Sequence, residues 1–236
     1  MYSAELAEVY ETIYRSRGKN WTTEAEDVVQ LIRRRRPEAA SLLDVACGTG
    51  AHLETFRKLF QDAEGVEIAE PMRKLALERL PGVTVHVGDM RDFELGRTYD
   101  AAVCLFSAIG YLVTVDDLNA AIGCMARHLV PGGVLVVEPW WFPEYHIEGY
   151  VAGDLARDEG RVISRISHST LQGRATRMEV RFTVADAAGF RDFTEVDVLT
   201  LFTRGEYETA FERAGCDLEF VPGPPSGRGL FIGTRR

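Results

Sequence analysis

The sequence has few of the features that mark secreted, membrane or nucleic-acid-binding proteins. Its 236 residues include only four cysteines, widely spaced and without a Cys-x-x-Cys or other metal-ligand pattern, so we expect reduced packing cysteines and no metal site. Residues 1–19 contain no long apolar run, which argues against a signal peptide or a membrane-spanning helix. The formal net charge of −9 argues against a phosphate-based grip on nucleic acid. We therefore expect a soluble, cytoplasmic protein without a membrane or nucleic-acid partner.

Strand-like and helix-like segments alternate over the first part of the chain. Hydrophobic residues make up 46% of the sequence, which suits one elaborated domain with a substantial core. The expected strands cover residues 41–46, 63–69, 83–88, 99–106 and 134–138, and the expected helices cover residues 23–36, 51–60, 70–80 and 116–129. The first helix begins at a capping box formed by Thr23 and Glu26. This alternation predicts an α/β fold with a Rossmann-like, doubly wound parallel sheet.

The pattern changes after Pro139. From Arg177 to Val184 polar and apolar residues alternate, which is the period of a strand with one solvated face. Segments 161–170 and 192–202 flank this strand, so we expect a small inserted antiparallel β-sheet. The α/β pattern resumes with a capping box at Thr203 and Glu206 and ends with paired strands over residues 217–221 and 230–234. Residues 1–139 and 203–236 are thus expected to form the main domain, and residues 140–202 an insertion that contributes to a substrate site.

A glycine-rich turn separates the first strand from the helix that follows. Asp44 lies at the carboxyl end of the strand, and Gly48 and Gly50 lie in the turn. Glycine tolerates positive φ and lets the backbone approach a ligand more closely than a residue with a Cβ atom. Because such turns also open dehydrogenase and phosphate-binding domains, the turn indicates a cofactor without identifying it.

Acidic residues at the ends of the next two strands narrow the choice. Glu67 ends the second strand, where an acidic side chain accepts hydrogen bonds from both hydroxyls of a ribose. Asp89 follows the third strand and is expected to accept from the exocyclic amine of adenine, while Met90 packs against the ring. Each carboxylate alone has the alternative role of a helix cap or a surface charge. Their conjunction favours a cofactor that contains adenosine.

NAD and S-adenosylmethionine both contain adenosine. The NAD pattern Gly-x-Gly-x-x-Gly lacks its third glycine, because Leu53 stands at that position. The pattern Asp-x-x-Cys-Gly-x-Gly over residues 44–50 instead resembles the first motif of class I S-adenosylmethionine-dependent methyltransferases. Residues 106–112 lack the Asn/Asp-Pro-Pro-Tyr/Phe segment of methyltransferases that act on nucleic-acid bases. We expect S-adenosylmethionine as the cofactor and a substrate other than a base.

Longer segments carry a closer resemblance. They are residues 10–19, 42–50, 88–93, 138–143, 167–169, 175–179 and 225–231, with the runs Glu-Pro-Trp-Trp-Phe-Pro and Pro-Ser-Gly-Arg-Gly-Leu-Phe among them. Over essentially the whole chain they resemble the dTDP-3-amino-deoxysugar N,N-dimethyltransferases of macrolide biosynthesis. The resemblance implies an enzyme that methylates the C3 amine of a thymidine diphosphate sugar twice. It also implies that the cofactor site includes Tyr14, Arg17, Ala46 and Leu105, and that the substrate site includes Ser169.

Aromatic residues after the fifth strand fit a nucleotide-sugar substrate. Trp141 and Phe142 leave the carboxyl end of that strand, the edge at which ligands bind in such sheets, so they are expected to stack on a sugar or thymine ring. The alternative is a hydrophobic contact between the main fold and the inserted sheet.

A diphosphate requires local positive charge in an acidic protein. Arg165, His168, Arg177 and Arg228 are expected to supply it, and Ser226 adds a hydroxyl beside Arg228. For Arg165 and Arg177 the alternative is a solvated strand face.

The expected chemistry asks little of the side chains. An unprotonated amine attacks the sulfonium methyl in line, so the enzyme mainly aligns the two centres and excludes solvent. The resemblance places Tyr2 and Tyr111 near the amine as proton acceptors, although some relatives carry His at the position of Tyr111. Methylation of another small metabolite and a non-catalytic cofactor-binding partner remain the alternatives. The oligomeric state also stays open, with a homodimer as one alternative.

Overall fold

The larger of two β-sheets, sheet A, forms the centre of the main domain. The computed structural model describes residues 3–158, 160–223 and 227–236. Sheet A contains β1 (Ser41–Val45), β2 (Asp62–Glu67), β3 (Val85–Val87), β4 (Tyr99–Cys104), β5 (Leu129–Val137), β10 (Cys216–Val221) and β11 (Leu230–Arg235). Its strand order is β10-β11-β5-β4-β1-β2-β3. The five strands from β5 to β3 in this order are parallel, and β11 and β10 are antiparallel additions at one edge.

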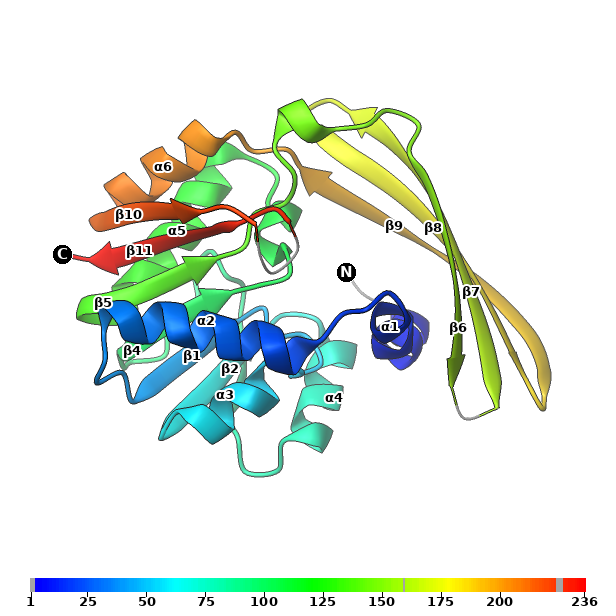
Figure 1. The fold of residues 1–236 in the computed structure, drawn as a ribbon, viewed down its shortest axis with the longest axis horizontal. Helices are drawn as coiled ribbons and strands as arrows, with labels where there is room; N and C mark the ends of the chain where they lie inside the picture. The colour runs from blue at the N-terminus through cyan, green and yellow to red at the C-terminus, as the bar shows by residue number, and fades with distance from the viewer. Residues whose placement is uncertain (1–2, 159, 224–226) are drawn as a thin grey trace.

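Helices cover both faces of sheet A (Figure 1). They are α2 (Trp21–Arg35), α3 (Leu53–Leu59), α4 (Glu70–Arg79), α5 (Val115–Arg127) and α6 (Arg204–Arg213), with the short 3₁₀ helices η1 (Ala108–Tyr111) and η2 (Pro143–Tyr145). Successive strand residues point to opposite faces. Leu43 therefore belongs to the core on the face of α5 and α6, together with Phe211, while Leu42 belongs to the core on the face of α2 and α3, together with Val29. The chain reverses its strand order between β4 and β1, and the carboxyl ends of these strands define the edge where a ligand binds in such sheets.

Sheet B is a separate antiparallel sheet made of long, twisted hairpins. It contains β6 (Val151–Asp158), β7 (Arg161–Gln172), β8 (Ala175–Asp186) and β9 (Gly189–Thr200), in that order. Helix α1 (Ala4–Ser16) lies between sheet B and the main domain (Figure 1). Its buried Val9 and Ile13 pack on Ile163 and Phe182 of sheet B. We call this the inner face of sheet B, and the opposite face the outer face.

Polar contacts tie α1 to the glycine-rich turn as well. The Glu11 carboxylate accepts a hydrogen bond from the Thr49 hydroxyl at 2.6 Å and pairs with Arg79. Helix α1 thus touches both the predicted cofactor turn and the inner face of sheet B.

The α/β class with an inserted antiparallel sheet is confirmed, and the structure corrects several details. Helix α2 begins at Trp21 because the Asn20 side chain, rather than Thr23, caps it by accepting from the Thr23 N–H at 3.1 Å. Residues 131–133, a turn by composition, lie within β5. Neither α1 nor β6 is among the elements expected from the sequence. In β6 only Ala156 is buried, so this strand lacks the apolar alternation that marks a strand.

Two further observations concern the cysteines and the membrane. All four cysteines are free and buried, in agreement with their expected packing role. Within the described part of the chain, no helix is long and apolar enough to cross a membrane.

Candidate active site

Glu67 holds the glycine-rich turn at the carboxyl ends of β1 and β2. Its Oε2 accepts the Gly48 N–H at 2.8 Å, and its Oε1 accepts the Ala69 N–H at 2.7 Å. Ala46 and Gly48 have φ values of 57° and 58°, so the turn takes the left-handed conformation that glycine favours. Burial raises the pKa of Glu67. Each carboxylate oxygen has two acceptor positions, so Glu67 retains the capacity to bind ribose hydroxyls.

Asp44 is a buried carboxylate with an unsatisfied oxygen. Its Oδ2 has no hydrogen-bond partner among the residues that the structure describes. Burial raises the pKa of Asp44 well above its usual range, and the nearby Glu67 carboxylate adds to the shift. A buried polar atom without a partner costs free energy unless a ligand satisfies it. Asp44 therefore fits a cofactor that brings a hydrogen-bond donor or a positive charge to this edge.

The two glycines of the turn have different surroundings. A Cβ atom on Gly48 would meet no protein atom within 4 Å, so this position leaves room for a ligand beside the backbone. A Cβ atom on Gly50 would lie 3.0 Å from Leu80 Cδ1 and 3.2 Å from Ala76 Cβ. Gly50 thus permits the close packing of α4 against the turn, and its predicted cofactor contact gains no support from its surroundings.

Asp89 and Met90, the predicted adenine contacts, follow β3, and Leu105, another predicted cofactor residue, follows β4. Asp89 accepts from Arg91 Nη2 at 2.6 Å, and this contact lowers the pKa of Asp89. Met90 is partly buried against the core, and Leu105 is buried at the end of β4. Asp89 therefore remains charged, with its carboxylate already shared with Arg91.

The end of α1 lies against the residue that follows Leu105. The rings of Tyr14 and Phe106 meet edge to face at a centroid distance of 4.8 Å. Burial raises the pKa of Tyr14. Arg17 extends instead toward sheet B, where its Nε lies 3.5 Å from Asp154 Oδ1. The Arg17 guanidinium also lies over the Tyr14 ring at 5.7 Å from its centroid, so the two predicted cofactor residues of this segment are neighbours.

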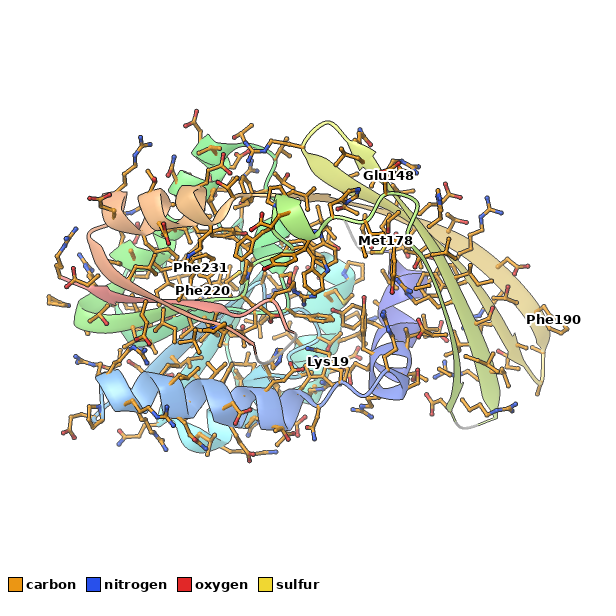
Figure 2. The ribbon with its side chains drawn as sticks, turned by 45° about the horizontal axis from the view of Figure 1, so that its top comes forward. Lys19, Glu148, Met178, Phe190, Phe220 and Phe231 are labelled. Carbon is orange, nitrogen blue, oxygen red and sulfur yellow. The ribbon has the colours of Figure 1, made fainter. Side chains whose placement is uncertain are left out.

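Lys19 connects α1 and α2 in the region between the two sheets (Figure 2). Its Nζ lies 3.7 Å from the centroid of the Phe106 ring and 2.5 Å from Glu24 Oε2. Glu24 also accepts His52 Nε2 at 2.9 Å. Burial lowers the pKa values of Lys19 and His52. No pattern in the sequence singles out this buried network beside the turn.

Arg228 precedes β11 at the same carboxyl edge of sheet A. Its Nη2 is 2.9 Å from Glu138 Oε1, and its guanidinium lies over the rings of Trp140 and Trp141 at centroid distances of 5.2 and 5.4 Å. Its Nε is buried and has no partner within the described ranges. Glu138 is fully buried and also accepts the Phe106 N–H at 2.7 Å. Arg228 is therefore held in place by a carboxylate, with part of its hydrogen-bonding capacity unused.

Sheet B divides the predicted substrate residues between its two faces. Arg165 and Ser169 are buried on the inner face, which α1 covers. His168 lies on the outer face, where it is the cross-strand neighbour of Glu179. Arg177 is on the outer face as well and pairs with Glu179 at 3.6 Å. The structure therefore does not bring His168 and Arg177 together with Arg165, and the expectation of one cluster of these cations is wrong.

Arg165 itself is closely surrounded. Its Nη1 lies 3.4 Å from Asp154 Oδ2 and 3.2 Å from Ser167 Oγ. It lines a cavity between α1 and sheet B together with Tyr14 and Asp197.

The aromatic segment after β5 also separates into two parts. Trp141 is 36% exposed beside Arg228. Phe142 is buried in the main core with Tyr207, Phe220 and Phe231, and Figure 2 shows the last two in the main body. Trp141 can meet a ligand, whereas Phe142 supports the segment from behind.

Tyr111 bridges the two sheets. Its hydroxyl donates to Asp197 Oδ1 on β9 at 2.8 Å. The other predicted catalytic residue, Tyr2, and the predicted substrate residue Ser226 lie outside the described residues.

Three carboxylates that were not expected from the sequence occupy central positions. Glu138, Asp154 and Asp197 pair with Arg228, Arg165 and Tyr111. Glu138 follows its strand much as Glu67 ends β2, so the position alone is a usable signal. For the other two, the contact depends on how sheet B packs, which no local pattern encodes.

Comparisons with known proteins fit this site. A model of the methyltransferase domain family matches residues 42–133, which contain the glycine-rich turn. A dTDP-4-amino-2,3,4,6-tetradeoxy-D-glucose N,N-dimethyltransferase of Saccharopolyspora spinosa is 54% identical over 235 residues, covering 100% of this chain and 94% of the relative. A dTDP-3-amino-3,4,6-trideoxy-alpha-D-glucopyranose N,N-dimethyltransferase of Streptomyces venezuelae is also 54% identical, covering 99% of both chains.

Solved structures agree in fold and sequence. Streptomyces venezuelae DesVI superposes with a TM-score of 0.96 at 53% identity, covering 100% of both chains. S-adenosylmethionine-bound CalS10, an amino pentose methyltransferase of Micromonospora echinaspora, superposes with a TM-score of 0.91 at 59% identity, covering 97% of both chains. Because these similarities extend over essentially the full length, the chain belongs to the dTDP-aminosugar N,N-dimethyltransferase family of class I S-adenosylmethionine-dependent N-methyltransferases.

Proposed function

We propose that this enzyme transfers two methyl groups in succession to the C3 amino group of a dTDP-linked amino deoxysugar. The observation that carries the proposal is the 48–54% identity, over 98–100% of this chain, to three dTDP-aminosugar N,N-dimethyltransferases. The carboxyl edge of sheet A carries a glycine-rich turn, acidic strand ends and Arg228, and the inner face of sheet B carries Arg165; these groups support a site for both the cofactor and the nucleotide sugar.

The turn and the acidic strand ends would hold S-adenosylmethionine. When bound, this cofactor supplies an activated methyl group on a sulfonium. Glu67 would accept hydrogen bonds from the ribose, and the unsatisfied Oδ2 of Asp44 offers an acceptor deeper in the same edge. Gly48 provides the space beside the backbone. Tyr14 would close the site from the side of α1.

Arg228 and Arg165 would hold the nucleotide sugar. Arg228 precedes β11 at the carboxyl edge of sheet A, Arg165 lies on the inner face of sheet B, and each retains donors for a diphosphate. Trp141 offers an exposed ring beside Arg228 for stacking. Because His168 and Arg177 lie on the outer face, they are not part of this proposed site.

Little further catalytic machinery is required. The residues that hold the cofactor and the nucleotide sugar would bring the amine and the methyl donor together and exclude water, and this alignment lowers the barrier. Tyr111 ends η1, which follows β4, and its hydroxyl bonds Asp197 of sheet B, so it would lie where it can contact the amine.

A C4 amine is the second candidate acceptor. The Saccharopolyspora spinosa relative is named for a 4-amino sugar and matches this chain at the same 54% identity as the 3-amino enzyme of Streptomyces venezuelae. Hydroxyl and amine positions on a sugar are distinguished by pocket shape, so the two candidates differ only in how the ring is placed.

Organisation and context form part of the proposal. Residues 140–202 would act as a substrate-binding unit on the methyl-donor domain of residues 1–139 and 203–236, with α1 packed between the two. The enzyme would work in the cytoplasm, in the synthesis of an antibiotic sugar such as that of a macrolide, without a nucleic-acid partner, and as a monomer or homodimer.

Mass spectrometry tests the proposal directly. Purified enzyme with S-adenosylmethionine is offered matched dTDP-3-amino and dTDP-4-amino deoxysugars. We expect additions of one and then two methyl groups to the 3-amino sugar, with lower kcat/KM for the 4-amino sugar. A higher kcat/KM for the 4-amino sugar would assign methylation to the C4 amine. Methyl transfer to neither sugar would contradict the proposal of an aminosugar substrate.

A further inference from the structure

One hydrogen bond connects the carboxyl edge of sheet A with the inner face of sheet B. The Tyr111 hydroxyl donates to Asp197 Oδ1 at 2.8 Å. Tyr111 ends η1, which follows β4 at the edge where ligands bind in such sheets. Asp197 lines the cavity between α1 and sheet B. The bond therefore joins the carboxyl edge of sheet A to a cavity that both apolar and charged side chains line.

The position of Tyr111 is fixed by close packing. A Cβ atom on Gly110 would lie 2.9 Å from Trp140 Cβ and 3.2 Å from Leu199 Cδ2, so η1 is pressed between β9 and the segment after β5. The Ser107 hydroxyl also donates to the Pro139 carbonyl at 2.7 Å. Because both ends of the bond sit on ordered elements, its geometry is built into the fold.

Asp197 lies in a mixed electrostatic environment. Burial raises the pKa of Asp197, the Tyr111 hydrogen bond lowers it, the Glu195 carboxylate raises it and the Arg165 guanidinium lowers it. Among the residues that the structure describes, the titratable and charged groups that face it are Tyr111 on η1, Glu195 on β9, Arg165 on β7, and Tyr10 and Tyr14 on α1. Asp197 is therefore a stronger base than an exposed aspartate, although a nearby cation still compensates its charge.

The chemistry requires a base twice. An aliphatic amine has a pKa of about 10 and is mostly an ammonium at neutral pH, without the lone pair that attacks a methyl group. The primary ammonium must lose one proton before the first methylation, and the secondary ammonium must lose one before the second. Each proton needs an acceptor that is available again in the next round.

We propose that Asp197 positions Tyr111 and accepts, through the Tyr111 hydroxyl, the proton that the substrate amine loses before each methylation. In this step the ammonium N–H bond breaks and its proton passes to the Tyr111 oxygen, while the tyrosine proton passes to Asp197 Oδ1. A neutral amine, a neutral tyrosine and a protonated carboxyl result, and the carboxyl then loses its proton to solvent before the next round. The inference rests on the proposed function.

The test compares kcat and KM across pH 6–10 for the wild type, Asp197→Asn, Tyr111→Phe and the double variant, with a dTDP-aminosugar as the substrate. Asp192→Asn serves as a matched control, because Asp192 lies on the outer face of the same strand and accepts from the Thr183 hydroxyl. Thermal unfolding of each variant checks the fold, and Asp197→Glu tests recovery by another carboxylate.

We expect kcat of Asp197→Asn to fall by about 100-fold near pH 7, a typical contribution of general base catalysis, with KM little changed. The deficit should shrink toward pH 10, where the amine loses its proton to solvent unaided. The double variant should be no slower than the slower single variant, because both act on one proton path. Asp197→Glu should recover part of the loss, and the rate of Asp192→Asn should match that of the wild type.

Two results would overturn the inference. A folded Asp197→Asn enzyme whose kcat follows the wild-type pH profile would exclude Asp197 as the acceptor. Losses that multiply in the double variant would show that the two residues act independently. If the wild type turns over no aminosugar, the proposed function fails, and this inference fails with it.

Discussion

The two sides of the proposed site handle charge in opposite ways. On the cofactor side, at the ends of β1 and β2, Asp44 and Glu67 are buried carboxylates that no arginine or lysine neutralises in the described structure, and burial raises both pKa values. On the substrate side, Arg228 before β11 of sheet A and Arg165 on the inner face of sheet B each hold a carboxylate partner. The cofactor side thus keeps unbalanced negative charge, while the substrate side keeps nearly balanced pairs.

This difference follows from the ligand of each side, a cation with hydroxyl donors on the cofactor side and an anion on the substrate side. A cofactor with a positive sulfonium, an ammonium and hydroxyl donors is favoured by preformed acceptors, even though these acceptors cost stability when no ligand is bound. A diphosphate is an anion and needs arginines. Because a buried arginine without a carboxylate partner carries an uncompensated charge while no ligand is bound, each arginine of the site is paired. We therefore expect the removal of a carboxylate and the removal of an arginine to have different effects on the folded protein.

Arg228→Ala is expected to have the largest effect. Removing the guanidinium leaves the fully buried Glu138 without its partner, which costs about 3–5 kcal/mol of folding free energy. It also removes a charged donor to the diphosphate, worth roughly 2–4 kcal/mol of substrate binding. Thermal unfolding measures the first effect, and KM for the dTDP-aminosugar together with binding of dTDP alone measures the second.

A double variant separates the two effects. Arg228→Ala with Glu138→Gln removes the buried unpaired charge, so it should regain stability without regaining dTDP affinity. Arg228→Lys should recover part of the binding, since lysine lacks the planar fork. A folded Arg228→Ala enzyme that binds dTDP normally would contradict the diphosphate role and leave Arg165 as the main cation.

The cofactor side of the site is the part that local sequence predicts well. A strand, a glycine-rich turn and a helix are consecutive in the chain, so Asp44 and Gly48 take their places through local geometry alone. The parallel pairing of β1 and β2 brings Glu67 to the same edge as the turn. The alternation of strands and helices along the sequence already implies this pairing.

The substrate side of the site is only partly predictable from the sequence. The period of a strand places Arg165 and His168 on opposite faces, because they are three residues apart, so this separation is readable from the sequence. The pairing of Tyr111 with Asp197 spans 86 residues and depends on how η1 packs on β9. Long-range contacts of this kind arise from the assembled fold and leave no local pattern.

Glu67→Ala should weaken S-adenosylmethionine binding by roughly 1–3 kcal/mol. The change removes the acceptor of the Gly48 and Ala69 N–H groups as well as that of the ribose hydroxyls. Calorimetric titration measures the affinity, and Glu70→Ala on the exposed start of α4 is the control. Equal affinity for the variant and the wild type would remove Glu67 from the site.

Arg165→Ala tests the substrate side of the site on the inner face of sheet B. We expect KM for the dTDP-aminosugar to rise roughly tenfold, which corresponds to about 1.4 kcal/mol. Arg177→Ala and His168→Ala are matched controls on the outer face and should leave KM unchanged. A larger effect from Arg177 than from Arg165 would show that the outer face takes part in substrate binding.

Asp44→Asn should stabilise the protein when no cofactor is bound. The variant removes a buried charge whose Oδ2 has no partner in the described structure, while it keeps the shape of the side chain. We expect a gain of about 1 kcal/mol near pH 8, measured by thermal unfolding without S-adenosylmethionine. Asp27→Asn on the exposed side of α2 changes the net charge equally and should leave stability unchanged.

The pH dependence tests the cause of this gain. Because burial raises the pKa of Asp44 in the folded state, its protonation favours folding at low pH, and that contribution is lost as the pH rises through the folded pKa. The stability difference between Asp44→Asn and the wild type should therefore be larger at pH 8 than at pH 5. Saturating S-adenosylmethionine should reverse the order, since a ligand stabilises most the protein that binds it most tightly. A stability difference that is constant from pH 5 to pH 8 would mean that the Asp44 carboxylate is already paired in the folded protein. The cofactor side and the substrate side would then not differ in charge balance.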